Sequence, residues 1–131
     1  MPETAPYVHR IPIRYGEVDM QGVVFNAHYL AYCDDAADTW WRQVLGPFED
    51  TGWEAMVVKA VIEWQGPAGI GDTLVIDASI VRWGTTSFDV AFRGSAGDRP
   101  VFTATVTYVG VDTATKSPKP PPPAVRQALG G

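Results

Sequence analysis

Hydrophobic and polar residues alternate along several segments of this chain, which is the pattern of strands that bury one face. In the segment 73–83, for example, Leu74, Ile76 and Ala78 fall on one side of an extended chain. Patterns of this kind predict strands over 7–15, 55–64, 73–83, 86–94 and 100–111. The turn signals Gly84-Thr85 and Gly97-Asp98 separate the last three strands, so we expect these to form an antiparallel meander.

One segment, 27–45, instead shows the three- and four-residue spacing of an amphipathic helix. Asn26 is the expected N-cap, and Gly46-Pro47 gives a strong stop signal. The predicted buried stripe consists of Tyr29, Cys33, Ala37, Trp40 and Val44. A second, polar face carries Asp34, Asp38 and Arg42, the last two as a favourable i,i+4 pair.

The order strand, long helix, four strands predicts one α+β domain in which the helix packs against a curved antiparallel sheet. Pro12 lacks an N–H, so the first strand is expected at an edge of the sheet or with a bulge. Residues 1–6 and about 115–131 are expected to be extended tails, the second with a short helical end at 124–129. A single helix leaves one face or edge of the sheet uncovered, so we expect a second copy to cover it.

Composition narrows the class of function. The net charge of −5 disfavours nucleic acid and anionic membranes as partners, because both need clustered cations. No apolar run approaches the length of a membrane span, and a reducing cytoplasm fits the single cysteine, Cys33. Cys33 lies on the apolar stripe, which favours a buried hydrophobic role over a nucleophilic one. His9 and His28 have no further ligands at metal-site spacing, so we expect no metal.

The chemistry most worth testing lies in residues 15–29, YGEVDMQGVVFNAHY. Glu17 and Asp19 precede the helix start, where backbone N–H groups lack partners within the helix. A carboxylate there can act as a general base on water, or attack a thioester carbonyl and form a mixed anhydride. Amides near Asn26 would hold the carbonyl oxygen, reinforced by the helix dipole. Spacing alone leaves open that both acids are solvated loop residues or cap the helix.

The same residues resemble the active-site segment of the 4-hydroxybenzoyl-CoA thioesterase family, which has the hotdog fold, a long central helix wrapped by a five-stranded antiparallel sheet. The shared pattern includes Tyr15, Glu17, Asp19 and Gly22, followed by two aliphatic residues and Phe25. A looser match includes 67–72 and Ser87. The resemblance implies that Asp19 is the catalytic carboxylate and that the backbone N–H near Asn26 stabilises the oxyanion.

The resemblance also implies the reaction, which is hydrolysis of an acyl- or aroyl-CoA thioester at a site between two subunits. No cofactor is implied beyond the coenzyme A of the substrate. The residues expected to contact the substrate are Gly22, Val23, His28, Tyr29, Trp53, Met56 and Ser87. Glu17 is expected to modulate Asp19 through like-charge proximity, which would raise the pKa of one of the two.

Two alternatives remain at this point. One is a thioesterase that acts on acyl groups bound to a carrier protein. Carrier proteins are usually acidic and this chain is acidic too, so coenzyme A is the preferred carrier. The other is a non-catalytic dimer that binds acyl groups. In all three cases we expect a homodimer or homotetramer, with no nucleic acid and no membrane as a partner.

Overall fold

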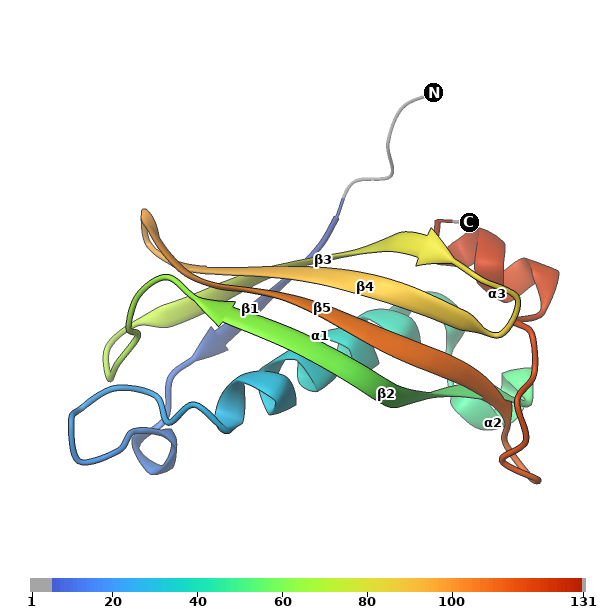
Figure 1. Ribbon diagram of the computed structural model, residues 1–131, viewed down its shortest axis with the longest axis horizontal. Coiled ribbons are helices and arrows are strands. Elements are labelled where there is room, and N and C mark those ends of the chain that lie inside the picture. Colours follow the sequence, from blue (N-terminus) through green and yellow to red (C-terminus); the bar gives the residue numbers. More distant parts are fainter. Residues whose placement is uncertain (1–5, 131) are drawn as a thin grey trace.

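A curved sheet and one long helix beneath it form the two layers of the molecule (Figure 1). The computed structural model describes residues 6–130, apart from the side chains at 48 and 49. The strands are β1 (Tyr7–Pro12), β2 (Trp53–Trp64), β3 (Thr73–Trp83), β4 (Ser87–Ala96) and β5 (Arg99–Asp112). They form a five-stranded sheet in the order β1-β3-β4-β5-β2, and every neighbouring pair is antiparallel. The predicted α+β architecture, the meander β3-β4-β5 and the edge position of Pro12 are confirmed.

The long helix α1 (His28–Leu45) buries one face against the inner face of the sheet. Four of the five residues of the predicted stripe are buried. Val44 was wrongly included, since it is 44% exposed. Trp41, which the predicted stripe omits, is buried at that end of the helix, and its ring packs against Phe88 and Tyr108 of the sheet. The predicted i,i+4 pair is present, with Arg42 Nε 3.0 Å from Asp38 Oδ2.

Within residues 6–130, three short helical segments complete the fold: η1 (Tyr15–Glu17), α2 (Phe48–Thr51) and α3 (Pro123–Ala128). The last of these confirms the short helix predicted near the C-terminus, but this tail is not merely extended. Val125 and Leu129 are buried in the core, and the carbonyl of Lys119 accepts a hydrogen bond from Trp53 Nε1 at 3.1 Å. The predicted N-terminal tail lies outside the described residues except for Pro6.

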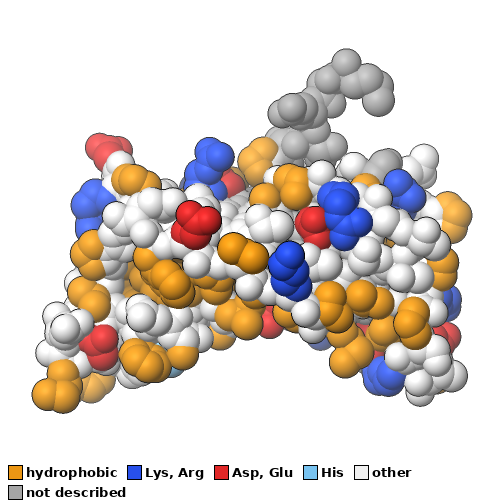
Figure 2. All heavy atoms as spheres, in the orientation of Figure 1, with side chains coloured by type: hydrophobic (Ala, Val, Ile, Leu, Met, Phe, Trp, Pro, Cys, Tyr) orange, Lys and Arg blue, Asp and Glu red, His pale blue; other side chains and the backbone are white. Residues whose placement is uncertain are grey.

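The edge strand β2 is only partly covered by α1. Its Trp64 end meets the helix, because Trp64 packs edge-on against Tyr29. Farther along the same inner face, Ala55 and Val57 are partly exposed. We call the exposed apolar residues of this strand the β2 edge: Met56, Val57, Val58, Val61 and Trp64. Figure 2 shows hydrophobic side chains gathered along this side of the molecule.

Within the part of the chain that the structure describes, no helix is long and apolar enough to cross a membrane.

Candidate active site

Asp19 lies in a small hairpin that leads into α1. Val18 and Val24 form an antiparallel bridge, and Asp19 N donates to Val23 O at 2.9 Å. The turn closes through a 3.0 Å hydrogen bond from Gly22 N to Asp19 O. Gly22 has φ +80°, a left-handed conformation that side chains disfavour. The glycine is therefore required by the turn, while its contact with substrate stays a prediction.

One oxygen of the Asp19 carboxylate accepts a hydrogen bond from the protein, and the other is available to a substrate or water. Its Oδ1 accepts a 2.8 Å hydrogen bond from Gln21 N, which forms an Asx turn. Its Oδ2 has no hydrogen-bond partner among residues 6–130, and the side chain is partly exposed. The side chain therefore stabilises its own turn and does not cap α1. This anchoring restricts the carboxylate to few orientations.

The start of α1 offers backbone donors close to this hairpin. Asn26 is not the N-cap as predicted, because the helix begins at His28 and Ala27 occupies the cap position without a side-chain hydrogen bond. The N–H groups of His28 and Tyr29 donate to Phe25 O and Asn26 O at 3.0 and 3.3 Å. The N–H groups of Asn26 and Ala27 have no acceptor in the described part of the chain. Such donors, at the positive end of a helix, can bind an oxyanion.

The Glu17 carboxylate is held by Arg14. It accepts hydrogen bonds from Arg14 N at 2.9 Å and from Arg14 Nε at 3.0 Å. The hydrogen bond from the Arg14 side chain lowers the pKa of Glu17, whereas a like-charge neighbour would raise it. Glu17 O also accepts from Phe25 N at 3.0 Å. The raised pKa that we expected for one of the two acids is therefore not that of Glu17, which holds η1 against the segment that enters α1.

The connection between β2 and β3 supports the Asp19 hairpin from the other side. Val24 N donates to Ala68 O at 2.8 Å, and Val23 forms a bridge with Gly69. A Cβ atom on Gly69 would lie 2.7 Å from Gly22 O, so only glycine permits this approach. Residues 67–72, which the sequence singled out, therefore pack directly against the turn that carries Asp19.

Asp72 holds this supporting loop in shape. Its Oδ2 accepts from Gly69 N and from Arg99 Nη2, both at 3.0 Å. Arg99 also donates to Pro67 O at 3.1 Å. The hydrogen bond from Gly69 N, followed by that from Arg99, lowers the pKa of Asp72. The charged form is thus favoured in the folded protein.

We expect the Asp72→Asn variant to lose stability in a pH-dependent way. A carboxyl whose pKa is lower folded than unfolded stabilises the protein above its unfolded pKa, about 3.9. This contribution is lost as the pH falls through the folded pKa. The wild type should exceed the variant in free energy of unfolding at pH 7, and the difference should shrink as the pH falls below about 4. Urea denaturation at several pH values measures it, with Asp98→Asn as the control; a constant difference would contradict the assignment.

Four of the predicted substrate contacts lie elsewhere than expected. Tyr29 and Trp53 are 2% and 1% exposed, so both side chains belong to the core and these two predictions are wrong for a single chain. Met56 pairs with Val109, whereas Val57 pairs with the inward Tyr108, so Met56 lies on the outer face. Ser87 Oγ accepts a 3.1 Å hydrogen bond from Arg82 Nη2. Val23 and His28 lie in or beside the Asp19 hairpin, and their contact with substrate stays a prediction.

The distance along the sheet explains why these residues do not meet Asp19 within one chain. The Asp19 hairpin packs on the loop that follows Trp64, whereas Trp53 and Ser87 lie at the opposite end of the sheet. At 3.3 Å per residue, the ends of β2 are about 35 Å apart. Ser87 and Met56 therefore lie far from Asp19 within one chain.

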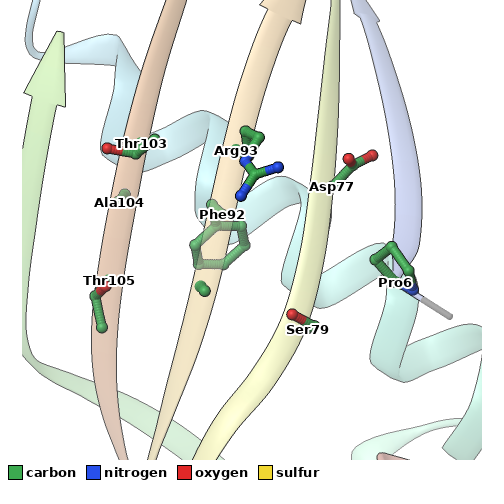
Figure 3. A pocket seen from close by; sticks show the side chains of 9 residues that line it. Pro6, Asp77, Ser79, Phe92, Arg93, Thr103, Ala104 and Thr105 are labelled. Carbon is green, nitrogen blue, oxygen red and sulfur yellow. The ribbon is translucent and has the colours of Figure 1, made fainter. Parts of the chain in front are cut away.

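Two of the depressions in the described part of the chain lie away from the Asp19 hairpin. One, of about 340 Å³, lies on the outer face of the sheet, with Asp77, Ser79, Arg93 and Thr105 among its lining residues (Figure 3). None of the predicted site residues lines it. The other, of about 280 Å³, lies between α1 and the inner face of β2 and includes Asp34 and Tyr108. Sequence analysis missed this second pair, since it placed Asp34 on a polar helix face.

Other candidate groups are accounted for structurally. Cys33 is fully buried, and burial raises the pKa of its thiol to about 12, which agrees with the predicted hydrophobic role. His9 Nε2 lies 2.8 Å from Asp35 Oδ2, while the ring of His28 packs edge-on against Phe25. No three His, Cys, Asp or Glu residues come together as a possible metal site within 6–130.

Comparison with models of known protein families shows the family to which the chain belongs. The family model described as the thioesterase-like superfamily matches residues 13–129, which includes both the Asp19 hairpin and the supporting loop. The chain belongs to the thioesterase-like superfamily. Membership agrees with the predicted enzyme class, a thioester hydrolase. It is broader than the 4-hydroxybenzoyl-CoA thioesterase family that the motif suggested.

Relatives span nearly the whole chain. A 1,4-dihydroxy-2-naphthoyl-CoA hydrolase of Synechococcus elongatus is 29% identical over 130 residues, covering 95% of this chain and 96% of the relative. A thioesterase superfamily protein of Jannaschia sp. CCS1 superposes with a TM-score of 0.90 at 20% identity, covering 98% and 94%. A 1,4-dihydroxy-2-naphthoyl-CoA thioesterase of Synechocystis superposes with a TM-score of 0.82 at 19% identity, covering 94% of each chain. The hotdog fold is confirmed.

Proposed function

We propose that this protein hydrolyses the coenzyme A thioester of an acyl group, and that an aromatic acyl group is preferred. The observation that carries the proposal is the pairing of an anchored carboxylate, Asp19, with two unpaired backbone N–H groups at Asn26 and Ala27. The carboxylate supplies the base or nucleophile, and the amides bind the oxygen of the polarised carbonyl. The aromatic preference is supported by the Synechococcus relative, whose name specifies a naphthoyl thioester.

The free Oδ2 of Asp19 has two routes to the same products. As a base, it takes a proton from water while the hydroxide attacks the carbonyl carbon, and the C–S bond then breaks. As a nucleophile, it attacks the carbon itself and forms a mixed anhydride, which water then hydrolyses. In both routes the thiolate of coenzyme A leaves and is protonated. In a single turnover in ¹⁸O-labelled water, attack of water on the aspartyl carbon of the anhydride leaves label in Asp19, whereas the base route places all of the label in the released acid. A labelled Asp19 therefore establishes the anhydride route.

We further propose that a second copy completes the site by pairing along β2. β2 is a long strand with one unpaired side, and such edges are normally protected. Antiparallel pairing about a two-fold axis would place the Met56 half of one strand beside the Trp64 half of the other. Exposed apolar residues around the Asp19 hairpin, Met20 and Phe25 among them, would then also be covered. The partner's end of the sheet would reach the Asp19 site.

Charges placed on the β2 edge should separate the copies. We expect the double variant Val58→Lys, Val61→Lys to be monomeric and to lose most hydrolysis, because lysines would face lysines across the axis. Val81→Lys is a matched control, since Val81 is 59% exposed on β3, away from this edge. Sedimentation velocity gives the oligomeric state. A double variant that stays dimeric would place the interface elsewhere.

The function is tested by thiol release from a panel of aromatic and aliphatic acyl-CoAs, with carrier-protein thioesters of the same acyl groups alongside. Faster release from aromatic coenzyme A thioesters is expected. Preference for the carrier-protein thioesters would establish the carrier-protein alternative. Binding of acyl-CoA without release of thiol from any member of the panel would establish a non-catalytic binding protein.

A further inference from the structure

The outer face of the sheet, which faces away from α1, carries its charges in an ordered pattern (Figure 3). Strand pairing places residues of this face side by side in three successive rows across β3, β4, β5 and β2. The Arg93 row consists of Asp77, Arg93, Thr103 and Glu63. The Ala91 row consists of Ser79, Ala91, Thr105 and Val61, and the Asp89 row of Arg82, Asp89, Thr107 and Lys59. Two charged rows therefore flank a row of short, uncharged side chains.

The two charged rows are opposite in net charge. The Arg93 row contains two acids and one arginine, and so carries a net charge of −1, whereas the Asp89 row contains two cations and one acid, for a net charge of +1. Asp77, Arg93 and Glu63 form no ion pair among residues 6–130. The Arg93 row therefore presents charges that no group of the same chain neutralises.

A two-fold axis that runs across the strands along the Ala91 row would place each charged row against the other charged row of a second copy. This rotation reverses the direction of the strands and keeps their order, so each strand faces the same strand of the other copy. The facing pairs, with one residue from each copy, would be Asp77 with Arg82, Arg93 with Asp89, and Glu63 with Lys59. All three pairs are opposite in charge, so the face is complementary to itself.

A two-fold axis along the strands does not fit the same charges. It would set each row against itself and reverse the order of the strands, so that β3 faces β2. Asp77 would then face Glu63, and Arg82 would face Lys59, which brings like charges together. The charge pattern therefore selects the axis that crosses the strands.

The short side chains of the Ala91 row allow two sheets to approach. Sheets that pack face to face lie about 10 Å apart, and the side chains of both inner layers fill the space between them. Ser79, Ala91 and Thr105 line the outer depression of about 340 Å³, together with Asp77 and Arg93. In the arrangement across the strands, this depression leaves room for a long side chain of the facing copy.

We propose that two outer sheet faces pack on each other through these rows, so that dimers joined along β2 associate into a tetramer. The proposal goes beyond the hydrolysis at Asp19 and rests only on the β2 pairing. One patch of three rows on four strands spans about 14 Å in each direction, or about 200 Å². A stable interface buries about 800 Å² on each partner, so one pair of patches does not hold two single chains together.

Pairing along β2 removes this limit, because it places two patches in one continuous sheet and both contacts then form together. The two axes are also compatible. The Ala91 row meets β2 at Val61, one residue from Ala60, the midpoint between Met56 and Trp64 about which β2 would pair. Two-fold axes that cross at right angles close an assembly at four copies. We therefore expect a concentration-dependent equilibrium between dimer and tetramer.

An exchange of charges along one row should dissociate the tetramer. The double variant Asp77→Arg, Arg93→Asp keeps the net charge and keeps opposite charges side by side within the chain. Across the axis, however, it sets arginine against Arg82 and aspartate against Asp89. The dissociation constant of the tetramer into dimers should rise by about a hundredfold or more. Sedimentation velocity at several protein concentrations measures this constant, and circular dichroism checks the fold.

An exchange of charges along one strand is the matched control. The double variant Lys59→Glu, Glu63→Lys reverses both members of a facing pair, so the opposite charges still meet and the tetramer should persist. Each single change sets like charges against each other and should weaken the tetramer by about tenfold or more. Raising the salt concentration from about 0.05 M to about 0.5 M should also favour the dimer.

A wild type that stays dimeric at every concentration would overturn the proposal, as would a tetramer that survives the exchange of Asp77 and Arg93. Equal dissociation by the two double variants would overturn it too, since the facing pairs would then not decide the assembly. Thiol release per subunit should be unchanged in the Asp77→Arg, Arg93→Asp variant, because the Asp19 hairpin and the β2 edge keep their residues. A protein that hydrolyses no thioester but shows the expected pattern of assembly would refute the proposed hydrolysis and support the tetramer.

Discussion

Asp19→Asn is expected to lower kcat for thioester hydrolysis by about 10³-fold, with little change in KM. An asparagine can still accept the hydrogen bond from Gln21 N, so the Asx turn and the hairpin should persist. The amide can neither take a proton from water nor attack the carbonyl carbon. The loss would therefore report on the chemistry of Asp19 and not on the shape of its loop.

Thiol release under saturating substrate measures this effect, and the far-ultraviolet circular dichroism of the variant checks its fold. Asp77→Asn serves as the control, because Asp77 lines the depression on the outer face of the sheet. Its kcat should match that of the wild type. If Asp19→Asn retains more than about a tenth of wild-type kcat, another group performs the reaction and the proposed mechanism fails.

Phe88→Ala is expected to cost about 3–5 kcal/mol of stability, the largest loss that we predict for a core position. Phe88 is fully buried at the centre of an aromatic cluster. Its ring centroid lies 5.2 Å from that of Trp83, 5.4 Å from that of Tyr108, and 5.8 Å from those of Trp41 and Trp53. Large rings cannot collapse into the space that the phenyl group would leave, so most of the cavity would remain.

Urea denaturation at one fixed protein concentration measures this loss, since subunit association would otherwise change the apparent stability. Val81→Ala is the control, because Val81 is 59% exposed on β3, away from the β2 edge, and its truncation should change stability by less than about 0.5 kcal/mol. If Phe88→Ala does not fold, Phe88→Leu provides a milder test. A loss in Phe88→Ala no larger than that in Val81→Ala would show that the cluster repacks.

Residues separated by a few positions were the ones whose placement could be predicted. The helix from His28, the meander of the last three strands and the Asp19 loop all follow from short-range patterns of apolar residues, glycines and turn signals. The partner of a side chain across the fold could not be predicted. Asp34 illustrates this, because its place on a polar helix face gives no sign of Tyr108, which lies 74 residues away in sequence.

Trp53 is a second residue whose partner lies in a distant segment, and here the prediction of a ligand contact was replaced by a place in the core. Its position after a loop favoured contact with a ligand, but the C-terminal tail supplies a carbonyl acceptor, Lys119 O, and buries it. Glu17 was judged by its neighbour two residues away, whereas Arg14 determines its ionisation. In both cases the deciding group was a hydrogen-bond partner that spacing alone did not identify.

The sequence by itself determined the order of elements, the α+β class and the segment that carries Asp19, because periodicity and turn chemistry act over a few residues. Only the tertiary structure decided which acids are held by cations, which aromatic residues form the core, and where an apolar groove stays open beside β2. These properties depend on contacts between distant segments. Such contacts form only when α1 packs on the sheet, where it leaves the edge strand β2 partly uncovered.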